Sequence, residues 1–455
     1  MTFKTETNNT ITDSFVTDLY AMSQIEFDES VYNQAKKCLL DYIGVTFAGS
    51  NMLREKTLQM LNNLGKTSQS ISVIGLNCKT GLLEAALING LNSHVAELDD
   101  GERFGMFHPG APIFSALVPV AQKFQISHQD FLKAIIVGYE ASIRLARSLQ
   151  PGLKDKGFHG TGICGTIGAA VAIGVALQFS KNQLKDAISA AATSSSGLLK
   201  VIKGRSEMKP LNVGIAAKNA VSSALLVMSG FEGPVDVLDG EKGFLNAYTG
   251  NYKNDELKIN IKSPAIMGIY MKPYAACRHC HPAIEAAIIL KNKHSLNPES
   301  IKAITIRTYY WAVGGHDHAD IEGISSAKMS TPFSVAVALE TEKAGINEFT
   351  TDLINQESIQ LLTKKVNVYA DEELTSLVPE KRGAIVQIET NNNLIFEERI
   401  DYPKGEPETP LSIEDVKEKF MGLSKYAGID NAVSQKIFKN LTSGKNDLTE
   451  LLQLL

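Results

Sequence analysis

The sequence predicts a mainly α-helical protein, with a large all-helical domain formed by both chain ends and a smaller inserted α+β lid domain. Three observations lead to this fold class. Along residues 11–250, apolar residues recur at helical spacing, and alternation of the strand type is nearly absent. Alternating, β-rich segments follow after about residue 250. Residues 412–455 return to helical spacing and are too short to form a core alone, so we expect them to rejoin the first domain.

These observations place the helical domain at residues 1–265 and 402–455 and the lid domain at 266–401. A chain of 455 residues is long enough for two domains. The net charge of −5 gives no electrostatic reason to expect nucleic acid or an anionic membrane as a partner. Five cysteines form no disulfide framework, and the polar N-terminus resembles neither a signal nor a transit peptide, so we expect a cytoplasmic protein.

The first half of the chain predicts a succession of helices. They are expected at 30–43, 54–64, 81–92, 113–124, 127–149, 181–195 and 213–229. The glycines of D-Y-I-G-V-T-F-A-G (41–49) are expected to end the first of these. Ser127 with Asp130 predicts a capping box, and Ser180 an N-cap. Residues 160–179 carry no charge over almost a bilayer-spanning length, but their Gly, Ala, Ile and Val content favours a helix buried inside the protein.

The lid domain is predicted to contain strands and two helices. Residues 301–310 predict a strand, and 384–390 with 394–400 predict a hairpin around an asparagine-rich turn. Helices are expected at 282–294 and 330–342. Residues 401–411 contain three prolines and a glycine, which is typical of a linker.

Chemistry-bearing residues gather first between two apolar runs, in H-V-A-E-L-D-D-G-E-R-F-G-M-F-H-P-G (94–110). This stretch holds four carboxylates, one arginine and two histidines, among them Glu97, Asp99, Asp100 and His108. It fits either an exposed charged loop or an acid/base loop at a pocket, since carboxylate and imidazole together can accept and donate protons near neutral pH.

Two further groups lie at expected helix starts. His159 precedes the buried helix, whose N-terminus suits an anionic ligand, although its glycines could serve close packing alone. No strand precedes that glycine-rich segment, so a dinucleotide loop is disfavoured. Lys209 stands just before Pro210, where a cation is unfavourable unless a carboxylate ligand is present; a solvated lysine is the alternative.

A fourth group is K-P-Y-A-A-C-R-H-C-H-P (272–282). Lys272, Arg278 and His281 predict a cationic edge that binds carboxylates. Cys277, Cys280 and His281 match C-x-x-C-H, but no second ligand pair accompanies them, so we expect packed cysteines and no metal. His316 and His318 are expected in a flexible, solvated loop.

In combination these stretches resemble the MmgE/PrpD family, which includes 2-methylcitrate dehydratase, cis-aconitate decarboxylase and iminodisuccinate epimerase. The resemblance covers nearly the whole chain. The matching stretches are residues 41–49, N-G-L-N-S-H-V-A-E-L-D-D (89–100), H-P-G (108–110), G-F-H-G-T-G-I-C-G-T-I-G-A-A (157–170), M-K-P-L-N-V-G-I-A-A (208–217), 272–284 and Y-P-K-G-E-P-E-T-P-L (402–411).

The resemblance implies a homodimer without metal or organic cofactor and an active site between the two domains. Carried over, that site holds the acidic loop, His108, His159, Lys209, Lys272 and His281. This chain has Glu97 where the family motif H-x-x-D-x-D-D begins its acids, and H-P-G where the dehydratases and decarboxylases often have H-P-S.

The leading functional hypothesis is a cofactor-independent lyase, a dehydratase or decarboxylase, acting on a small di- or tricarboxylate by general acid/base chemistry. We expect His108, Asp100, His159, Lys209 and Lys272 to be catalytic, with His108 preferred as the acid that protonates the carbanion left by loss of CO₂. Residues expected to bind substrate are Glu97, Asp99, Arg278 and His281. An epimerase of a small dicarboxylate, a catalytically silent carboxylate-binding dimer and, more weakly, a metal hydrolase are the alternatives.

Overall fold

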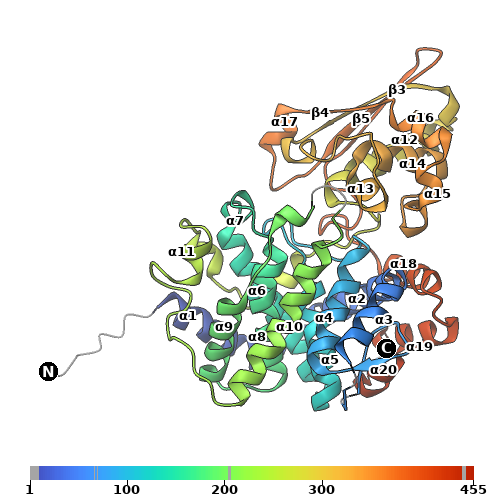
Figure 1. The fold of residues 1–455 in the computed structure, drawn as a ribbon. Helices are drawn as coiled ribbons and strands as arrows, with labels where there is room; N and C mark the ends of the chain where they lie inside the picture. The colour runs from blue at the N-terminus through green and yellow to red at the C-terminus, as the bar shows by residue number, and fades with distance from the viewer. Residues whose placement is uncertain (1–9, 66, 69, 203–205, 443–446) are drawn as a thin grey trace.

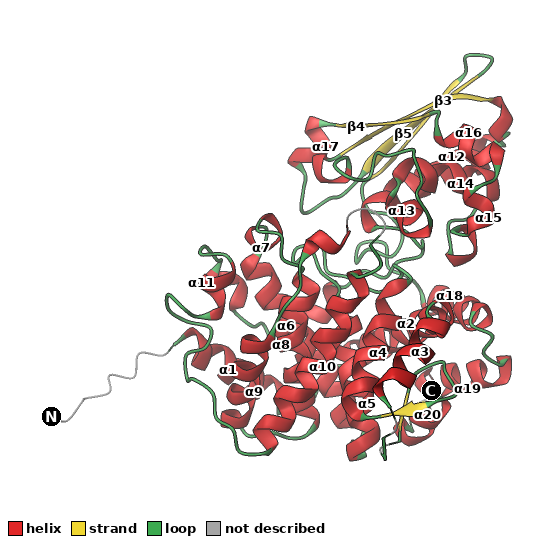
Figure 2. Cartoon of the chain, viewed as in Figure 1, coloured by secondary structure: helices red, strands yellow, loops and turns green. Residues whose placement is uncertain are grey.

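The computed structural model describes residues 10–65, 67–68, 70–202, 206–442 and 447–455. The fold is mainly helical, as the sequence predicts. Figure 1 shows two lobes, and Figure 2 shows that the larger is built from helices while the smaller carries the main sheet. We call them the helical lobe (α1–α11 and α18–α20) and the sheet lobe (α12–α17 and β3–β6).

The helical lobe is centred on α8, which packs against α5, α6, α9 and α10. Its first eleven helices are α1 (Ile11–Ser23), α2 (Glu29–Met52), α3 (Arg54–Leu64), α4 (Leu82–Val95), α5 (Gly110–Phe124), α6 (His128–Leu149), α7 (Gly152–Asp155), α8 (Gly160–Ala176), α9 (Lys181–Ser194), α10 (Lys209–Met228) and α11 (Phe244–Tyr248). Two short strands, β1 (Ile71–Ser72) and β2 (Lys79–Thr80), pair beside α4 and α5.

The predicted buried helix is α8, and its glycines allow close approach to α6. A Cβ on Gly168 would lie 2.5 Å from the Cβ of Ser142 and 2.8 Å from the carbonyl oxygen of Gly138, so a larger residue would force the two helices apart. The predicted caps also form: Ser127 accepts from the Asp130 amide, and Ser180 completes a capping box with Gln183. Among the described helices, α10 is long and apolar enough to cross a membrane by length and composition, but half of that window is buried in the protein.

The predicted end of the helix at residues 30–43 is wrong, because this helix, α2, continues through both glycines to Met52. The reason is tertiary packing. A Cβ on Gly49 would lie 1.8 Å from the carbonyl oxygen of Asn92, so this glycine permits α2 and α4 to touch rather than terminating the helix.

The C-terminal helices pack on the N-terminal ones. They are α18 (Ile413–Tyr426), α19 (Asn431–Thr442) and α20 (Leu448–Leu454). Helix α18 lies on α2, where Phe420 covers Gly44, and α20 contacts α5. In Figure 1 the red C-terminal helices accordingly lie beside the blue N-terminal ones.

The sheet lobe holds a four-stranded sheet of order β4–β3–β5–β6. Its elements are α12 (His281–His294), β3 (Ile301–Thr308), α13 (Ile324–Met329), α14 (Thr331–Thr341), α15 (Thr351–Ile354), α16 (Glu357–Thr363), β4 (Val366–Ala370), α17 (Glu372–Ser376), β5 (Ala384–Thr390) and β6 (Ile395–Ile400). The predicted hairpin is β5–β6, which pairs antiparallel, and α12 packs against both of its strands. Strand β4, parallel to β3, was not predicted; it is a short edge strand with an exposed outer face.

The two lobes share apolar and charged contacts. Val45, Ala96 and Leu98 of the helical lobe belong to the same apolar core as the residues of α12 and α14. The segment 401–411, predicted as a linker, forms no helix or strand, yet its Glu406 is 1% exposed and binds Arg103 and Arg278. This segment therefore braces the lobes instead of merely spacing them.

Candidate active site

A cavity of about 760 Å³ opens between the two lobes. Its wall takes Glu97 and Lys209 from the helical lobe, and His316, His318 and Lys328 from the sheet lobe. A cavity of this size accommodates a small organic ligand. Glu97 and Lys328 are buried and Lys209 is half-buried, which is unusual for ion-forming side chains unless they are paired or serve a ligand. The other charged wall residues are exposed: Lys56, Glu207, Asp320 and Glu322.

Glu97 links two of the predicted lysines. Its Oε1 lies 2.5 Å from Nζ of Lys209, and its Oε2 lies 3.8 Å from Nζ of Lys272, which also donates to the Glu97 carbonyl oxygen at 3.0 Å. Burial acts to raise the pKa of the Glu97 carboxyl, but Lys209 and Lys272 outweigh it and hold that pKa well below its usual range. Glu97 has a φ of +58°, a strained conformation of the kind that gathers at functional sites.

Lys328 was missed by the sequence analysis and is the most unusual residue of the cavity wall. It is 2% exposed, and its ammonium donates to the carbonyl oxygen of Ala96 at 2.9 Å. No carboxylate among the described residues forms an ion pair with it. Burial lowers the pKa of Lys328 to about 8. The charge of Glu97 acts on this ammonium but only partly offsets its burial, so an anion in the cavity would stabilise it.

A histidine cluster adjoins these lysines without lining the cavity. His94 Nδ1 donates to Asp99 Oδ2 at 2.7 Å, and His108 Nδ1 lies 3.6 Å from the same oxygen. The ring of His94 is 5.2 Å from that of His108 and 5.8 Å from that of His159, centroid to centroid. Burial opposes ionisation of Asp99, but His94 and His108 outweigh it and keep its pKa well below the usual range.

His108 and His159, on either side of His94, differ in which ring nitrogen carries the proton. His108 Nδ1 donates to the carbonyl oxygen of Asp100 at 2.6 Å, so its Nε2 is left as an acceptor. His159, the N-cap residue of α8, accepts at Nδ1 from the side-chain amide of Asn212 at 3.1 Å, which leaves the proton on Nε2. Burial lowers the pKa of His108 to about 3 and that of His159 well below 6.5, so both are neutral at pH 7 without ligand.

The side chain of Asp100, which was predicted to be catalytic, forms its hydrogen bonds with other residues of the helical lobe. Its Oδ2 accepts from the Tyr139 hydroxyl at 2.5 Å and its Oδ1 from the Gly110 amide at 3.0 Å, at the start of α5. Burial raises its pKa to about 7. In this arrangement Asp100 fixes the loop and, through its carbonyl oxygen, the ring of His108.

Of the nine predicted site residues, only Glu97 and Lys209 line the cavity. Arg278 and His281 have partners elsewhere in the protein. Arg278 donates from Nε to Glu406 Oε1 at 2.6 Å, so its charge is matched inside the brace between the lobes. His281, at the start of α12, bonds through Nε2 to the carbonyl oxygen of Ala276 at 3.1 Å. The sequence could not reveal the Arg278 pairing, because Glu406 lies far along the chain in a segment with the composition of a linker.

The C-x-x-C-H residues do not converge either. Cys280 is buried against Met329 and Thr331, as the packing interpretation expects. Cys277 instead faces His316 Nε2 at 3.9 Å. Burial acts to raise the pKa of the Cys277 thiol, but His316 and Lys209 lower it to about 6. The prediction of a flexible loop around His316 is wrong, since its Nδ1 bonds to the Met329 carbonyl oxygen at 2.7 Å and the ring is half-buried.

Two residues of the site escaped the sequence analysis for different reasons. His94 lies inside the first acidic stretch, but the stretch alone does not reveal which histidine contacts Asp99. Lys328 lies in the last turn of α13, and nothing in the sequence around it marks it as buried. Residues 203–205, a few positions before Lys209, lie outside the part of the chain that the structure describes.

Comparison with known proteins gives matches along most of the chain. Residues 16–257 match the MmgE/PrpD N-terminal domain and residues 274–442 match the MmgE/PrpD C-terminal domain. A cis-aconitate decarboxylase from Aspergillus terreus is 26% identical over 461 residues, covering 94% of this chain and 92% of that protein. The cis-aconitate decarboxylase of Homo sapiens is 27% identical, covering 95% and 92%, and that of Mus musculus is 26% identical, covering 90% and 86%.

Proposed function

Because this chain belongs to the MmgE/PrpD family, we propose that it is a lyase that removes a carboxyl group from a small unsaturated tricarboxylate such as cis-aconitate, without a metal or organic cofactor. The relatives named cis-aconitate decarboxylase support the lyase class. The single observation that carries the substrate class is Lys328, a buried ammonium on the cavity wall without a carboxylate partner among the described residues.

Substrate carboxylates would complete the charge balance at the buried end of the cavity. Lys209 and Lys272 share Glu97, and Lys328 forms no ion pair among the described residues, so at this end three lysines face one carboxylate. The other charged wall residues, Lys56, Glu207, Asp320 and Glu322, are exposed. A hydrogen bond between charged groups contributes about 1.5–3 kcal/mol, so two such contacts are enough to hold a small polycarboxylate. The cavity volume of about 760 Å³ leaves room for a ligand of this size together with water.

The chemical step needs a place for charge and a source of one proton. The C–C bond to the departing carboxylate breaks, CO₂ leaves, and the electron pair spreads over the conjugated double bond and its carboxylate. The lysine ammoniums stabilise that charge, and one proton is then added to carbon. We assign the donor role to His108, which does not line the cavity wall but keeps 15% side-chain exposure and is close enough to Lys272 and Lys209 for their charges to act on it. The substrate's negative charges raise an imidazole pKa that burial otherwise depresses.

An epimerase of a small dicarboxylate is the second candidate. It is favoured by the two neutral histidines beside His94, of which His108 presents an accepting Nε2 and His159 a proton on Nε2. Such a pair could remove a proton from one face of a carbon acid and return one to the other. A dehydratase would use the same groups, with a hydroxyl leaving in place of CO₂.

A panel of acids separates these activities. The purified protein is incubated with cis-aconitate, with citrate-type hydroxy acids and with aspartate-type acids, and CO₂, new double bonds and α-proton exchange are measured. The proposal expects CO₂ from the unsaturated tricarboxylate. Water loss from a hydroxy acid alone would make the protein a dehydratase, and exchange without either would make it an epimerase. Binding without turnover of any acid would support a silent carboxylate-binding protein.

A further inference from the structure

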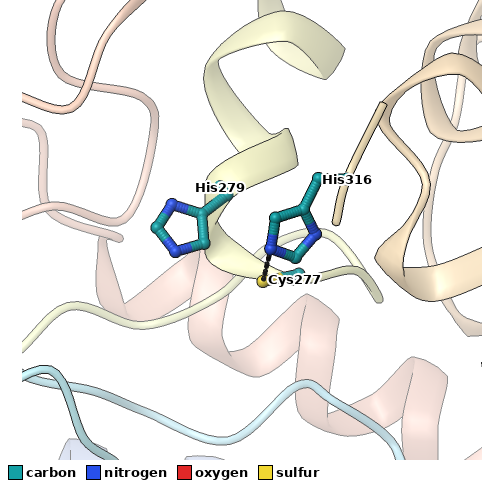
Figure 3. Close-up of side chains that lie close together, drawn as sticks. All are labelled: Cys277, His279 and His316. Carbon is teal, nitrogen blue, oxygen red and sulfur yellow. Dashed lines mark hydrogen bonds between the residues drawn. The ribbon is translucent and has the colours of Figure 1, made fainter. Parts of the chain in front are cut away.

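A group of three side chains beside the cavity has no part in the proposed reaction. Cys277 and His279 stand at the turn before α12, and His316 comes from the loop that follows β3. Figure 3 shows the Cys277 thiol and the His316 ring facing each other, with the His279 ring next to them. Their potential ligand atoms all lie within 4.8 Å of one another, and among the described residues no other group of three or more His, Cys, Asp or Glu side chains is this compact.

Contacts outside this group fix the two imidazoles. His316 Nδ1 bonds to the Met329 carbonyl oxygen at 2.7 Å; because a carbonyl only accepts, Nδ1 carries a proton, and Nε2, which faces the Cys277 thiol, is the nitrogen that would bind an ion after releasing any proton it holds. His279 Nδ1 bonds to the Tyr309 hydroxyl at 2.6 Å, which leaves its Nε2 as the remaining nitrogen. Metal-binding histidines are typically held in this way, with one ring nitrogen bonded to an outer partner and the other on the ion.

The spacing is close to that of a zinc site. With a Zn–S bond of about 2.3 Å and a Zn–N bond of about 2.0 Å, tetrahedral geometry places sulfur and nitrogen about 3.5 Å apart. Cys277 Sγ and His316 Nε2 are 3.9 Å apart, so this pair needs an adjustment of a few tenths of an ångström. The ligand atom of His279 lies within 4.8 Å of the other two and would have to move closer when an ion binds. Cys280 and His281 are held elsewhere, so this is not the C-x-x-C-H set of the sequence.

Nearby cations restrict which ion could bind. Lys154, Arg278 and Arg382 are all close enough to His279 to act on its charge. Their repulsion acts on any cation, so binding depends on strong donor bonds, and a hard ion such as Mg²⁺ or Ca²⁺ needs oxygen ligands that this group lacks. A thiolate with two imidazoles offers strong donor bonds to a softer ion.

We propose that Cys277, His279 and His316 form a binding site for a soft transition-metal ion of the Zn²⁺ class. Three protein ligands leave a fourth position open to water or an anion. Because His316 also lines the cavity, an ion bound there would lie at the cavity wall. The proposal does not depend on the reaction assigned to the cavity.

The test uses the full-length protein, freed of metal with a chelator and titrated with Zn²⁺ by calorimetry and with Co²⁺ by absorption spectroscopy. We expect one equivalent of either ion and, for Co²⁺, a thiolate charge-transfer band. Cys277→Ser should abolish that band and weaken Zn²⁺ binding by more than the roughly 10- to 100-fold typical of outer-shell changes. Tyr309→Phe should weaken it within that range.

Matched controls are Cys280→Ser and His318→Ala, which change the same residue types nearby and should bind like the unaltered protein. If Cys277→Ser does not fold, as judged by circular dichroism, His316→Ala carries the same prediction for Zn²⁺ affinity. Zn²⁺ binding of equal strength in the altered and unaltered proteins, the absence of a thiolate band with Co²⁺, or no binding at all would overturn the proposal.

Discussion

Replacing Lys328 with methionine should make the protein more stable and a poorer catalyst. Methionine keeps the length of the side chain but removes the ammonium. A pKa lowered from 10.5 to about 8 means that the protonated ammonium costs about 3 kcal/mol more in the folded protein than in the unfolded chain. The substitution also removes the hydrogen bond to the Ala96 carbonyl oxygen, worth about 1–2 kcal/mol. The free energy of unfolding at pH 7 should therefore rise by about 1–2 kcal/mol.

The effect of Lys328→Met on the free energy of unfolding should depend on pH. Below pH 8 Lys328 is protonated in both states, and the full cost of the buried charge is present. Between pH 8 and 10.5 the folded protein has released the proton while the unfolded chain still holds it, so the stability of the unaltered protein rises with pH. The advantage of Lys328→Met should shrink over that interval.

Substrate binding should change in the opposite direction. Loss of one charged contact of about 1.5–3 kcal/mol raises KM for a polycarboxylate about 10- to 100-fold. Chemical denaturation at pH 7 and pH 10, together with steady-state kinetics, measures both effects. Lys302→Met, at an exposed lysine paired with Glu389, is the control. A Lys328→Met protein that is less stable and has an unchanged KM would show that Lys328 serves the fold and not the substrate.

Four other substitutions test proton transfer, the contacts between the lobes and the pH dependence of stability. His108→Asn should lower kcat about 100- to 10,000-fold without changing the melting temperature, and near-normal turnover would remove His108 from the mechanism. Glu406→Gln leaves buried Arg278 without its carboxylate partner and should cost about 3–5 kcal/mol of unfolding free energy, whereas Glu408→Gln, at the more exposed partner of Arg103, should cost under about 1 kcal/mol; equal losses would contradict the brace. In the unaltered protein, stability should fall as pH rises from 4 to 7, because buried Asp100 keeps its proton to about pH 7 while the unfolded chain releases it near 3.8. Asp100→Asn should lose that slope in denaturation series, and an unchanged slope would assign it to other groups.

The sequence predicted the elements whose signals are local. The apolar, uncharged composition of α8 indicates by itself that the helix is buried. Ser127 and Ser180 mark helix starts, and the asparagine-rich turn marks the β5–β6 hairpin. The predictions failed where contacts between residues far apart in the sequence determine the structure. Gly49 does not end α2, because its role is to admit Asn92 of another helix.

The same distinction applies to the site. Glu97, Lys209 and Lys272 stood out by residue type and position, and the fold brings their charged groups together. Arg278 belonged to an equally suggestive cationic stretch, but Glu406 matches its charge. No local pattern specifies such a partner. Lys328 was overlooked because a single lysine in the last turn of a short helix becomes informative only once its burial is known.

The removal of one carboxyl group from a small unsaturated tricarboxylate, which we propose for this protein, is tested by incubating it with cis-aconitate in D₂O and following the mixture by ¹H and ¹³C NMR. We expect one CO₂ for each dicarboxylate formed, with one solvent deuterium on the carbon that accepts the proton. Unchanged cis-aconitate under conditions where the protein is folded and binds the acid would contradict it.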